Sequence, residues 1–175
     1  GVIFTLDTES GSRDVVLISG VWGLGEAIVQ GIADPDEFLV HKQTLKRGFE
    51  YVLRRRIGAK QVKLVYGSRA DAGHTKWQKV PKKLRVIQCV TDAEILDLAR
   101  QAVQIEEHYS TYYRTPMPMD IEWAKDGPKG DLYIIQARPE TVHASADKAM
   151  LKLYRLTGDG PVVVSGQAVG QGISE

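Results

Sequence analysis

Two segments decide the fold, Met119-Asp-Ile-Glu-Trp-Ala124 and Leu132-Tyr-Ile-Ile-Gln-Ala-Arg-Pro-Glu-Thr141. Both are rich in β-branched and aromatic residues, which favours strands over 118–124 and 131–137. The hexapeptide between them, Lys125-Asp-Gly-Pro-Lys-Gly130, is built from residue types that form turns. The sequence therefore predicts an antiparallel hairpin at this point of the chain.

One face of this hairpin collects polar side chains. Residues two apart on a strand share a face, so Asp120 and Glu122 point the same way, and Gln136 and Arg138 repeat the pattern on the second strand. The residues between them are apolar and face the opposite side. If the strands pair across the turn, two carboxylates, an amide and a guanidinium share one surface.

Such a surface suits a magnesium ion and a polyphosphate. Mg²⁺ takes hard oxygen ligands and is commonly held by one or two carboxylates together with substrate phosphates, and Glu122 and Gln136 supply such oxygens. A cation such as Arg138 clamps phosphate and neutralises the charge that develops as a phosphoryl group leaves. A solvated hairpin face with an incidental ion pair would show the same spacing, so spacing leaves both interpretations open.

Composition narrows the class of protein. The 175 residues are 43% apolar and 26% charged with a net charge of +1, which is typical of a globular protein and gives no overall field to attract nucleic acid or an anionic membrane. No apolar stretch approaches the roughly 20 residues that a membrane-spanning helix needs. The one cysteine, Cys89, cannot form an internal disulfide and has apolar neighbours. We expect a cytoplasmic protein with a buried thiol, and neither nucleic acid nor membrane as partner.

Further elements follow from the periodicity of the sequence. Strands are predicted over 2–6, 14–19, 37–42, 50–57, 61–66 and 84–88. A short helix is predicted from Gly23 to about Gly31, where glycine supplies a left-handed stop. A longer helix is predicted over 93–109, with Thr91 and Glu94 forming a capping box. The stretch 74–83 has the composition of a connecting loop, and 143–156 that of a polar helix.

Several segments carry a family resemblance. The hairpin is similar to the closing hairpin of the ATP-binding domain in the phosphoenolpyruvate synthase family, also called pyruvate, water dikinases. Gly1-Val-Ile-Phe-Thr-Leu-Asp-Thr8, Gly23-Leu-Gly-Glu26 and Gln30-Gly-Ile-Ala-Asp-Pro-Asp-Glu-Phe38 resemble successive parts of the same domain, in the same order. The resemblance covers residues 1–145, and the tail resembles the entry to a phosphohistidine domain.

The resemblance implies an α+β fold, the C-terminal subdomain of an ATP-grasp domain, with a mainly antiparallel sheet, flanking helices, and ATP and Mg²⁺ as cofactors. Glu122 and Gln136 would be the metal ligands, and Asp120 a carboxylate on the nucleotide side. Arg138 would contact the terminal phosphates as the catalytic cation. Glu26 is a further cofactor-binding candidate. The glycines before Glu26 would either cradle phosphate at a helix start or only satisfy a turn.

The resemblance also implies how the whole enzyme is organised. Residues 1–145 would be the C-terminal half of the ATP-grasp domain, 146–160 a linker, and 161–175 the start of the phosphohistidine domain. The family is a phosphotransferase with paired acceptors, which converts ATP, pyruvate and water into AMP, phosphoenolpyruvate and phosphate through a histidine on a swivelling domain. The partners would be the N-terminal ATP-grasp half, the phosphohistidine domain and the pyruvate-binding barrel. A homo-oligomer stays open.

Because the chain begins inside a predicted strand without an initiator Met, we expect a fragment boundary at Gly1. The resemblance places the other ATP-grasp half, the phosphohistidine and the pyruvate-binding barrel outside these residues, so we expect no activity from the fragment alone. Two alternatives remain. One is the ATP domain of a related dikinase or phosphotransferase with another acceptor, and the other is a non-catalytic module that retains the fold.

The stretch Lys42 to Lys63 is rich in basic residues, with Glu50 as its one acidic residue. A nucleic-acid patch is one interpretation. Alternation along a strand, however, sends Arg54 and Arg56 to one face and Arg55 to the other, which favours a solvated strand or a contact between domains.

Overall fold

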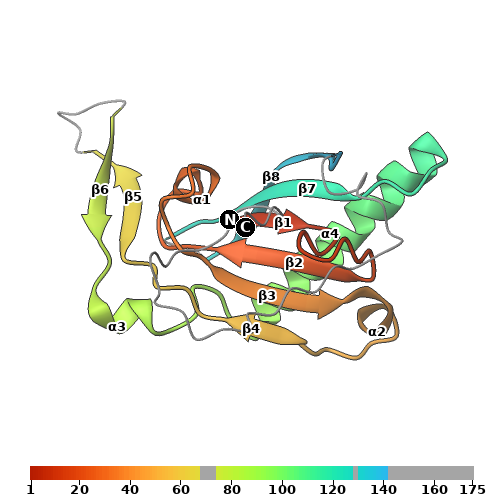
Figure 1. Ribbon diagram of the computed structural model, residues 1–175, viewed down its shortest axis with the longest axis horizontal. Coiled ribbons are helices and arrows are strands. Elements are labelled where there is room, and N and C mark those ends of the chain that lie inside the picture. The colour runs from red at the N-terminus through yellow and green to blue at the C-terminus, as the bar shows by residue number, and fades with distance from the viewer. Residues whose placement is uncertain (68–73, 128–129, 142–175) are drawn as a thin grey trace, which may run out of the picture.

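The structure, a computed structural model, describes residues 1–67, 74–127 and 130–141. Its main feature is a six-stranded antiparallel sheet (Figure 1). The expected α+β fold with a mainly antiparallel sheet is confirmed. The linker predicted at 146–160, the domain start predicted at 161–175 and the polar helix predicted at 143–156 lie outside the described residues.

The strands of the main sheet follow the order β4-β3-β2-β1-β7-β8. Their bounds are β1 Val2–Phe4, β2 Val15–Gly20, β3 Asp36–His41, β4 Arg54–Arg56, β7 Met119–Lys125 and β8 Leu132–Pro139. A separate two-stranded sheet pairs β5, Val62–Tyr66, with β6, Thr75–Lys79. The helices are α1 Glu26–Val29, α2 Lys42–Lys46, α3 Lys82–Arg85 and α4 Asp92–Tyr113.

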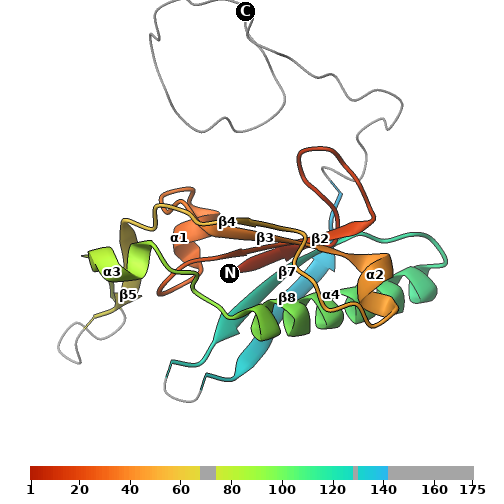
Figure 2. The same cartoon turned by 90° about the horizontal axis from the view of Figure 1, so that it is seen from below.

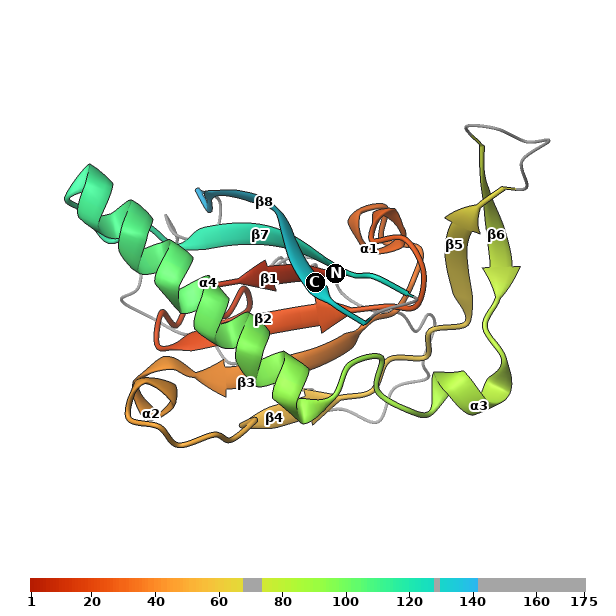
Figure 3. The ribbon, with the colours of Figure 1, turned by 180° about the vertical axis from the view of Figure 1, so that it is seen from behind.

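The long helix α4 covers one face of the main sheet. Seen from behind, it crosses β7, β1, β2 and β3 (Figure 3), and seen from below it lies on one side of the strands while α1 lies on the other (Figure 2). The core between α4 and the sheet contains Ile3, Ile18 and Phe38 from the strands and Ile95 and Leu98 from the helix, all fully buried. Burial of each such side chain contributes about 1.5–3 kcal/mol. The opposite face of the sheet remains free of α4.

The capping box predicted at the start of α4 is confirmed. The Thr91 side chain accepts a hydrogen bond from the Glu94 amide at 3.3 Å, and the Glu94 carboxylate accepts one from the Thr91 amide at 2.8 Å. Two of the unpaired amides at the helix start are thereby satisfied. The helix begins at Asp92 and ends at Tyr113, four residues beyond the predicted end.

A buried ion pair joins three segments at the edge of the sheet. Lys60 and Asp36 are fully buried and paired with each other. Asp36 also accepts hydrogen bonds from the backbone amides of Gly58 and Cys89, both at 2.9 Å. One carboxylate therefore ties the start of β3 to the chain after β4 and to the chain before α4. Lys60 adopts a positive φ of 40°, a conformation that non-glycine residues rarely take.

Several predicted elements are wrong in extent or type. The strand predicted over 84–88 is absent, because α3 occupies Lys82–Arg85 and the apolar Val86 and Ile87 that follow it are exposed. The loop predicted over 74–83 contains β6, which pairs with β5 through its backbone.

Two further differences arise around β3 and β4. The strand predicted over 50–57 is reduced to Arg54–Arg56, since only the Glu37–Leu39 part of β3 pairs with it. The helix α2 was missed. It begins at Lys42, the last residue of the strand predicted over 37–42. The His41 ring nitrogen caps the helix by accepting a hydrogen bond from the Thr44 amide.

We expect Lys60→Met to destabilise the purified chain by about 3–5 kcal/mol, because the substitution leaves the Asp36 carboxylate buried without its countercharge. Urea unfolding followed by circular dichroism measures the change. Lys63→Met, which removes a charge that makes no ion pair within the described residues, is the matched control and should shift the free energy of unfolding by less than about 0.5 kcal/mol. Equal effects of the two substitutions would contradict the role assigned to the buried pair.

We expect the Cys89 thiol to resist modification in the folded protein. Burial, followed by the nearby Asp36 carboxylate, raises its pKa to about 12, so the neutral thiol persists through neutral and mildly alkaline pH. At pH 8 the thiolate fraction should be about a thousandfold below that of an ordinary exposed cysteine. Ellman's reagent should react only after denaturation, and rapid labelling of the native protein would contradict this prediction.

Candidate functional site

The candidate site lies on the hairpin of β7 and β8, whose pairing confirms the prediction. Asp120 lies opposite Arg138 and Glu122 lies opposite Gln136. Met119, Ile121 and Trp123 alternate with the two carboxylates and are buried against α4. Because successive side chains on a strand point to opposite faces, Asp120 and Glu122 point to the face that α4 leaves uncovered.

The polar groups of the hairpin contact one another. The Arg138 Nε donates a hydrogen bond to the Asp120 Oδ2 at 2.9 Å, and the Arg138 Nη2 lies 3.6 Å from the Glu122 Oε1. This hydrogen bond, together with the charge of Asp120, raises the pKa of Arg138, a guanidinium that carries its charge at every pH at which proteins are folded. One cation therefore faces two carboxylates, closely at Asp120 and loosely at Glu122.

The register changes in the middle of the hairpin. Glu122 pairs with Gln136 but Trp123 pairs with Ile134, which leaves Ile135 as an extra residue in β8. This β-bulge exposes Ile135 and Gln136 together, although they are neighbours in sequence. An apolar side chain thus stands beside the amide on the polar side. Sequence alternation missed this feature, because the pair Ile134-Ile135 gives no sign of which isoleucine is inserted.

The neighbouring strand supplies an apolar floor beside the carboxylates. In β1, Val2 lies opposite Glu122 and Phe4 lies opposite Asp120, and both are partly buried. Residues directly opposite each other on paired strands share a face, so Val2 and Phe4 belong to the same surface as the charged groups. The site therefore combines a charged edge on the hairpin with an apolar centre on the sheet.

Glu26 stands apart from this group. It is exposed at the start of α1, and its carboxylate accepts a hydrogen bond from the Gln30 side chain at 2.7 Å. Within the described residues no hydrogen bond or ion pair joins it to the hairpin. Gly25, which precedes it, lies close to Gly1 at the start of the chain, so α1 lies near the same end of the sheet as Glu122 (Figure 1).

The glycine before this helix has a structural explanation. Gly23 has a φ of +83°, and a Cβ there would lie 2.3 Å from the Leu64 carbonyl oxygen. The next amide, that of Leu24, donates to the same oxygen at 2.8 Å. The glycine is thus required by a turn packed against β5. The helix α1 is a single turn, Glu26–Val29, shorter at both ends than the helix predicted from Gly23 to about Gly31, and Gly31 follows it with the positive φ of +67° that the prediction required.

The chemistry of the site fits a magnesium ion shared with a ligand. Across the described ranges no group of three or more His, Cys, Asp or Glu side chains could hold a metal ion. Glu122 and Gln136 offer two oxygen ligands on directly opposed positions, and Mg²⁺ commonly completes its octahedron with phosphate oxygens and water.

None of the helices that the structure describes has the length and apolarity needed to cross a membrane.

Comparison with known proteins defines the class. Residues 1–157 match the family described as the pyruvate phosphate dikinase, AMP/ATP-binding domain. The chain belongs to this family. It is also similar to phosphoenolpyruvate synthases, which confirms the resemblance inferred from the motifs: 52% identity over 174 residues for the protein of Pseudomonas aeruginosa (strain UCBPP-PA14), and 45% over 174 residues for that of Escherichia coli (strain K12).

These alignments cover 99% of this chain but only 21% of each relative. The phosphoenolpyruvate synthase of Synechocystis sp. is 46% identical over 178 residues, again covering 21% of its length. The chain therefore spans about one fifth of the length of these relatives.

We expect the ion pair of Arg138 and Asp120 to contribute little to folding. The Arg138 side chain is 54% exposed, and exposed ion pairs add little to stability because water screens them. Arg138→Ala should leave the urea unfolding midpoint close to that of the unsubstituted chain, with Arg114→Ala as an exposed control. A clear fall in this midpoint would indicate a structural role for Arg138.

Proposed function

We propose that this chain is the magnesium- and ATP-binding part of an ATP-grasp domain in a phosphoenolpyruvate synthase. Glu122 and Gln136 are the metal ligands, Asp120 is a carboxylate on the nucleotide side, and Arg138 contacts the terminal phosphates. The observation that carries this proposal is the hairpin register, which places all four groups on the open face of the sheet.

The charge balance of the hairpin supports these roles. Arg138 engages Asp120 at 2.9 Å but stands 3.6 Å from Glu122, so the Glu122 carboxylate is the less neutralised of the two. Glu122 therefore keeps negative charge that a divalent cation held there would balance. The exposed Arg138 can turn toward a phosphate without breaking core packing, since its side chain lies outside the buried layer.

When bound, magnesium neutralises the oxygens of the phosphates and helps the phosphoryl group to leave. The residues of this chain orient the reactants. Glu122 and Gln136 hold the metal on the polar side of the hairpin, and Arg138 donates hydrogen bonds toward the terminal phosphates. The apolar floor formed by Val2 and Phe4 lies beside these groups. Glu26 remains a proposed cofactor contact near the same end of the sheet.

The names of the relatives support the reaction. We infer that the complete enzyme transfers a phosphoryl group from ATP to pyruvate, with water as second acceptor, through a histidine outside this chain. A dikinase that uses phosphate in place of water is the second candidate, favoured by the description of the matching family. The synthase is preferred because the relatives compared above, at 45–52% identity, bear that name.

We expect Glu122→Ala in the full-length enzyme to lower the rate of phosphoenolpyruvate formation by about 10²–10³-fold, because a ligand oxygen that places the metal and phosphates is lost. Steady-state assays over a range of magnesium concentrations measure this. Glu9→Ala, an exposed carboxylate outside the site, is the control. Wild-type rates for Glu122→Ala, with unchanged magnesium dependence, would overturn the assigned role.

We expect the isolated 175-residue chain to bind ATP weakly and to turn nothing over, because the proposed domain closes on the nucleotide with a second half. Isothermal titration calorimetry with Mg²⁺ and ATP measures the affinity. The full-length enzyme is the positive control. Micromolar affinity in the isolated chain would contradict the proposed division of the pocket.

A further inference from the structure

A projecting ribbon carries a concentration of positive charge. We define the basic arm as residues 61–67 and 74–85, which contain β5, β6 and α3 and extend away from the main sheet (Figures 1 and 3). At its root, Leu64 is buried against Ala27 and Ala33. The arm is thus anchored at β5 and free along β6.

The charges of the arm have one sign. Its residues include no Asp or Glu and six cations: Lys63, Lys76, Lys79, Lys82, Lys83 and Arg85. Within the described residues none of the six forms an ion pair, whereas Lys42, Arg56 and Arg138 on or beside the main sheet all do. Since the whole chain carries a net charge of only +1, acidic residues elsewhere offset the positive charge of the arm.

The arm is a two-stranded ribbon whose side chains are largely exposed to solvent. An isolated pair of strands is marginally stable in water. Every residue of β6 is exposed, and Tyr66 and Trp77 are 75% and 43% exposed. Trp77 lies opposite Leu64 on the paired strands, so the two side chains are on the same face of the ribbon. This is the face that packs against Ala27 and Ala33 at the root of the arm. The opposite face of the ribbon carries Lys76, which lies opposite Val65.

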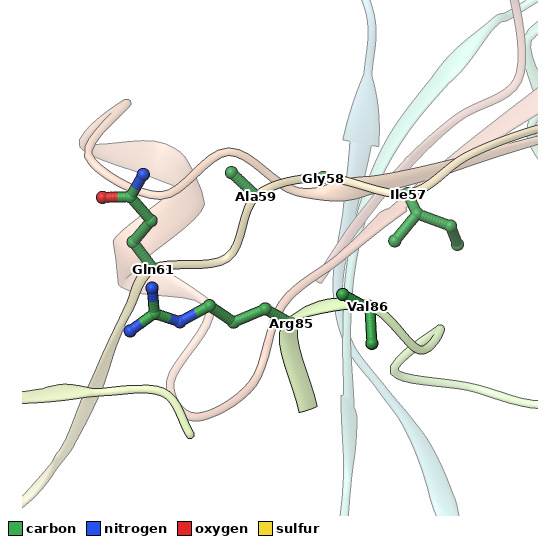
Figure 4. A pocket seen from close by; sticks show the side chains of 6 residues that line it. All are labelled: Ile57, Gly58, Ala59, Gln61, Arg85 and Val86. Atoms are coloured by element: carbon green, nitrogen blue, oxygen red, sulfur yellow. The ribbon is translucent and has the colours of Figure 1, made fainter. Parts of the chain in front are cut away.

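A pocket of about 520 Å³ opens at the base of the arm, between the chain after β4 and the end of α3 (Figure 4). Arg85 is the one cation among the described residues that line it, and its guanidinium lies beneath the segment that ends at Gln61, whose amide extends away from it. The Arg85 Nε donates to the Val80 carbonyl at 2.7 Å, which orients the side chain. The terminal nitrogens have no hydrogen-bond partner within the described residues.

The walls of this pocket are apolar and exposed. Val86 is 74% exposed and Ile57 lies across from it. The buried pair of Asp36 and Lys60 holds both walls, because Asp36 binds the amide of Gly58 on one side and that of Cys89 on the other. A short acidic side chain would fit this arrangement, with its methylenes on the apolar walls and its carboxylate on the guanidinium.

We propose that the basic arm and its pocket dock an acidic surface of another domain of the same polypeptide, with an Asp or Glu side chain of that surface seated against Arg85. The occupant is assigned to the same polypeptide because this chain spans only about one fifth of the length of its relatives. A nucleic acid is the weaker fit, because Trp77 faces the root of the arm and is not presented outward for base stacking.

Zero-length carbodiimide crosslinking of the full-length enzyme tests the proposal, because it joins lysine amines only to carboxylates in contact with them. Peptide mass spectrometry should find crosslinks from Lys76 and Lys79 to Asp or Glu outside residues 1–175. Their yield should fall by about tenfold or more in the variant Lys82→Glu, Lys83→Glu, Arg85→Glu, because like charges then face each other. It should also fall in 1 M salt, where the screening length is about 3 Å.

Arg47→Glu is the matched control, since Arg47 is exposed, lies outside the arm and makes no ion pair within the described residues, and it should leave the yield unchanged. Three results would overturn the proposal: no crosslinks leaving residues 1–175, crosslinks that form only between isotopically distinct subunits, or arm lysines protected by a nuclease-sensitive ligand. None of the three substituted residues belongs to the proposed ATP site, so magnesium-dependent ATP binding by the triple variant reports separately on the proposed function.

Discussion

The burial of three alternate residues of β7 against α4 is the constraint on which the site depends. Met119, Ile121 and Trp123 sit in the core, and because side chains alternate along a strand, Asp120 and Glu122 must face away from the helix. A shift of one residue in this register would bury both carboxylates in an apolar layer, at a high cost in desolvation. The packing of the core thus holds the acidic groups on the open face.

The sheet carries two groups of ion pairs that differ in their exposure to water. On the open face, Arg138 balances two carboxylates in contact with water, where the pair adds little stability and remains available for a ligand. At the sheet edge, Lys60 and Asp36 are removed from water entirely and hold three segments together. Exposure separates the two roles, because a charge in water can change partners and a buried charge cannot.

The net charge of the chain does not show where its charged residues gather, and the basic arm is the example. The net charge of +1 is the sum over the whole chain, whereas six cations that form no ion pair among the described residues gather on one projecting ribbon. For the basic stretch before it, the alternation expected from the sequence is confirmed: Arg56 pairs with Asp34 and Glu37, while Arg55 turns the other way and pairs with Asp92. Arg55 and Arg56 are thus paired within the chain, whereas the cations of the arm form no ion pair with any residue that the structure describes.

The sequence by itself determined the antiparallel hairpin, the face shared by Asp120, Glu122, Gln136 and Arg138, the capped long helix and the family, because these rest on local periodicity, turn chemistry and motif order. Only the tertiary structure decided that Ile135 is inserted beside Gln136, that Lys60 pairs with Asp36, that 84–88 is no strand and that β6 exists. Each of these depends on which distant segment lies alongside, and no local pattern records that partner.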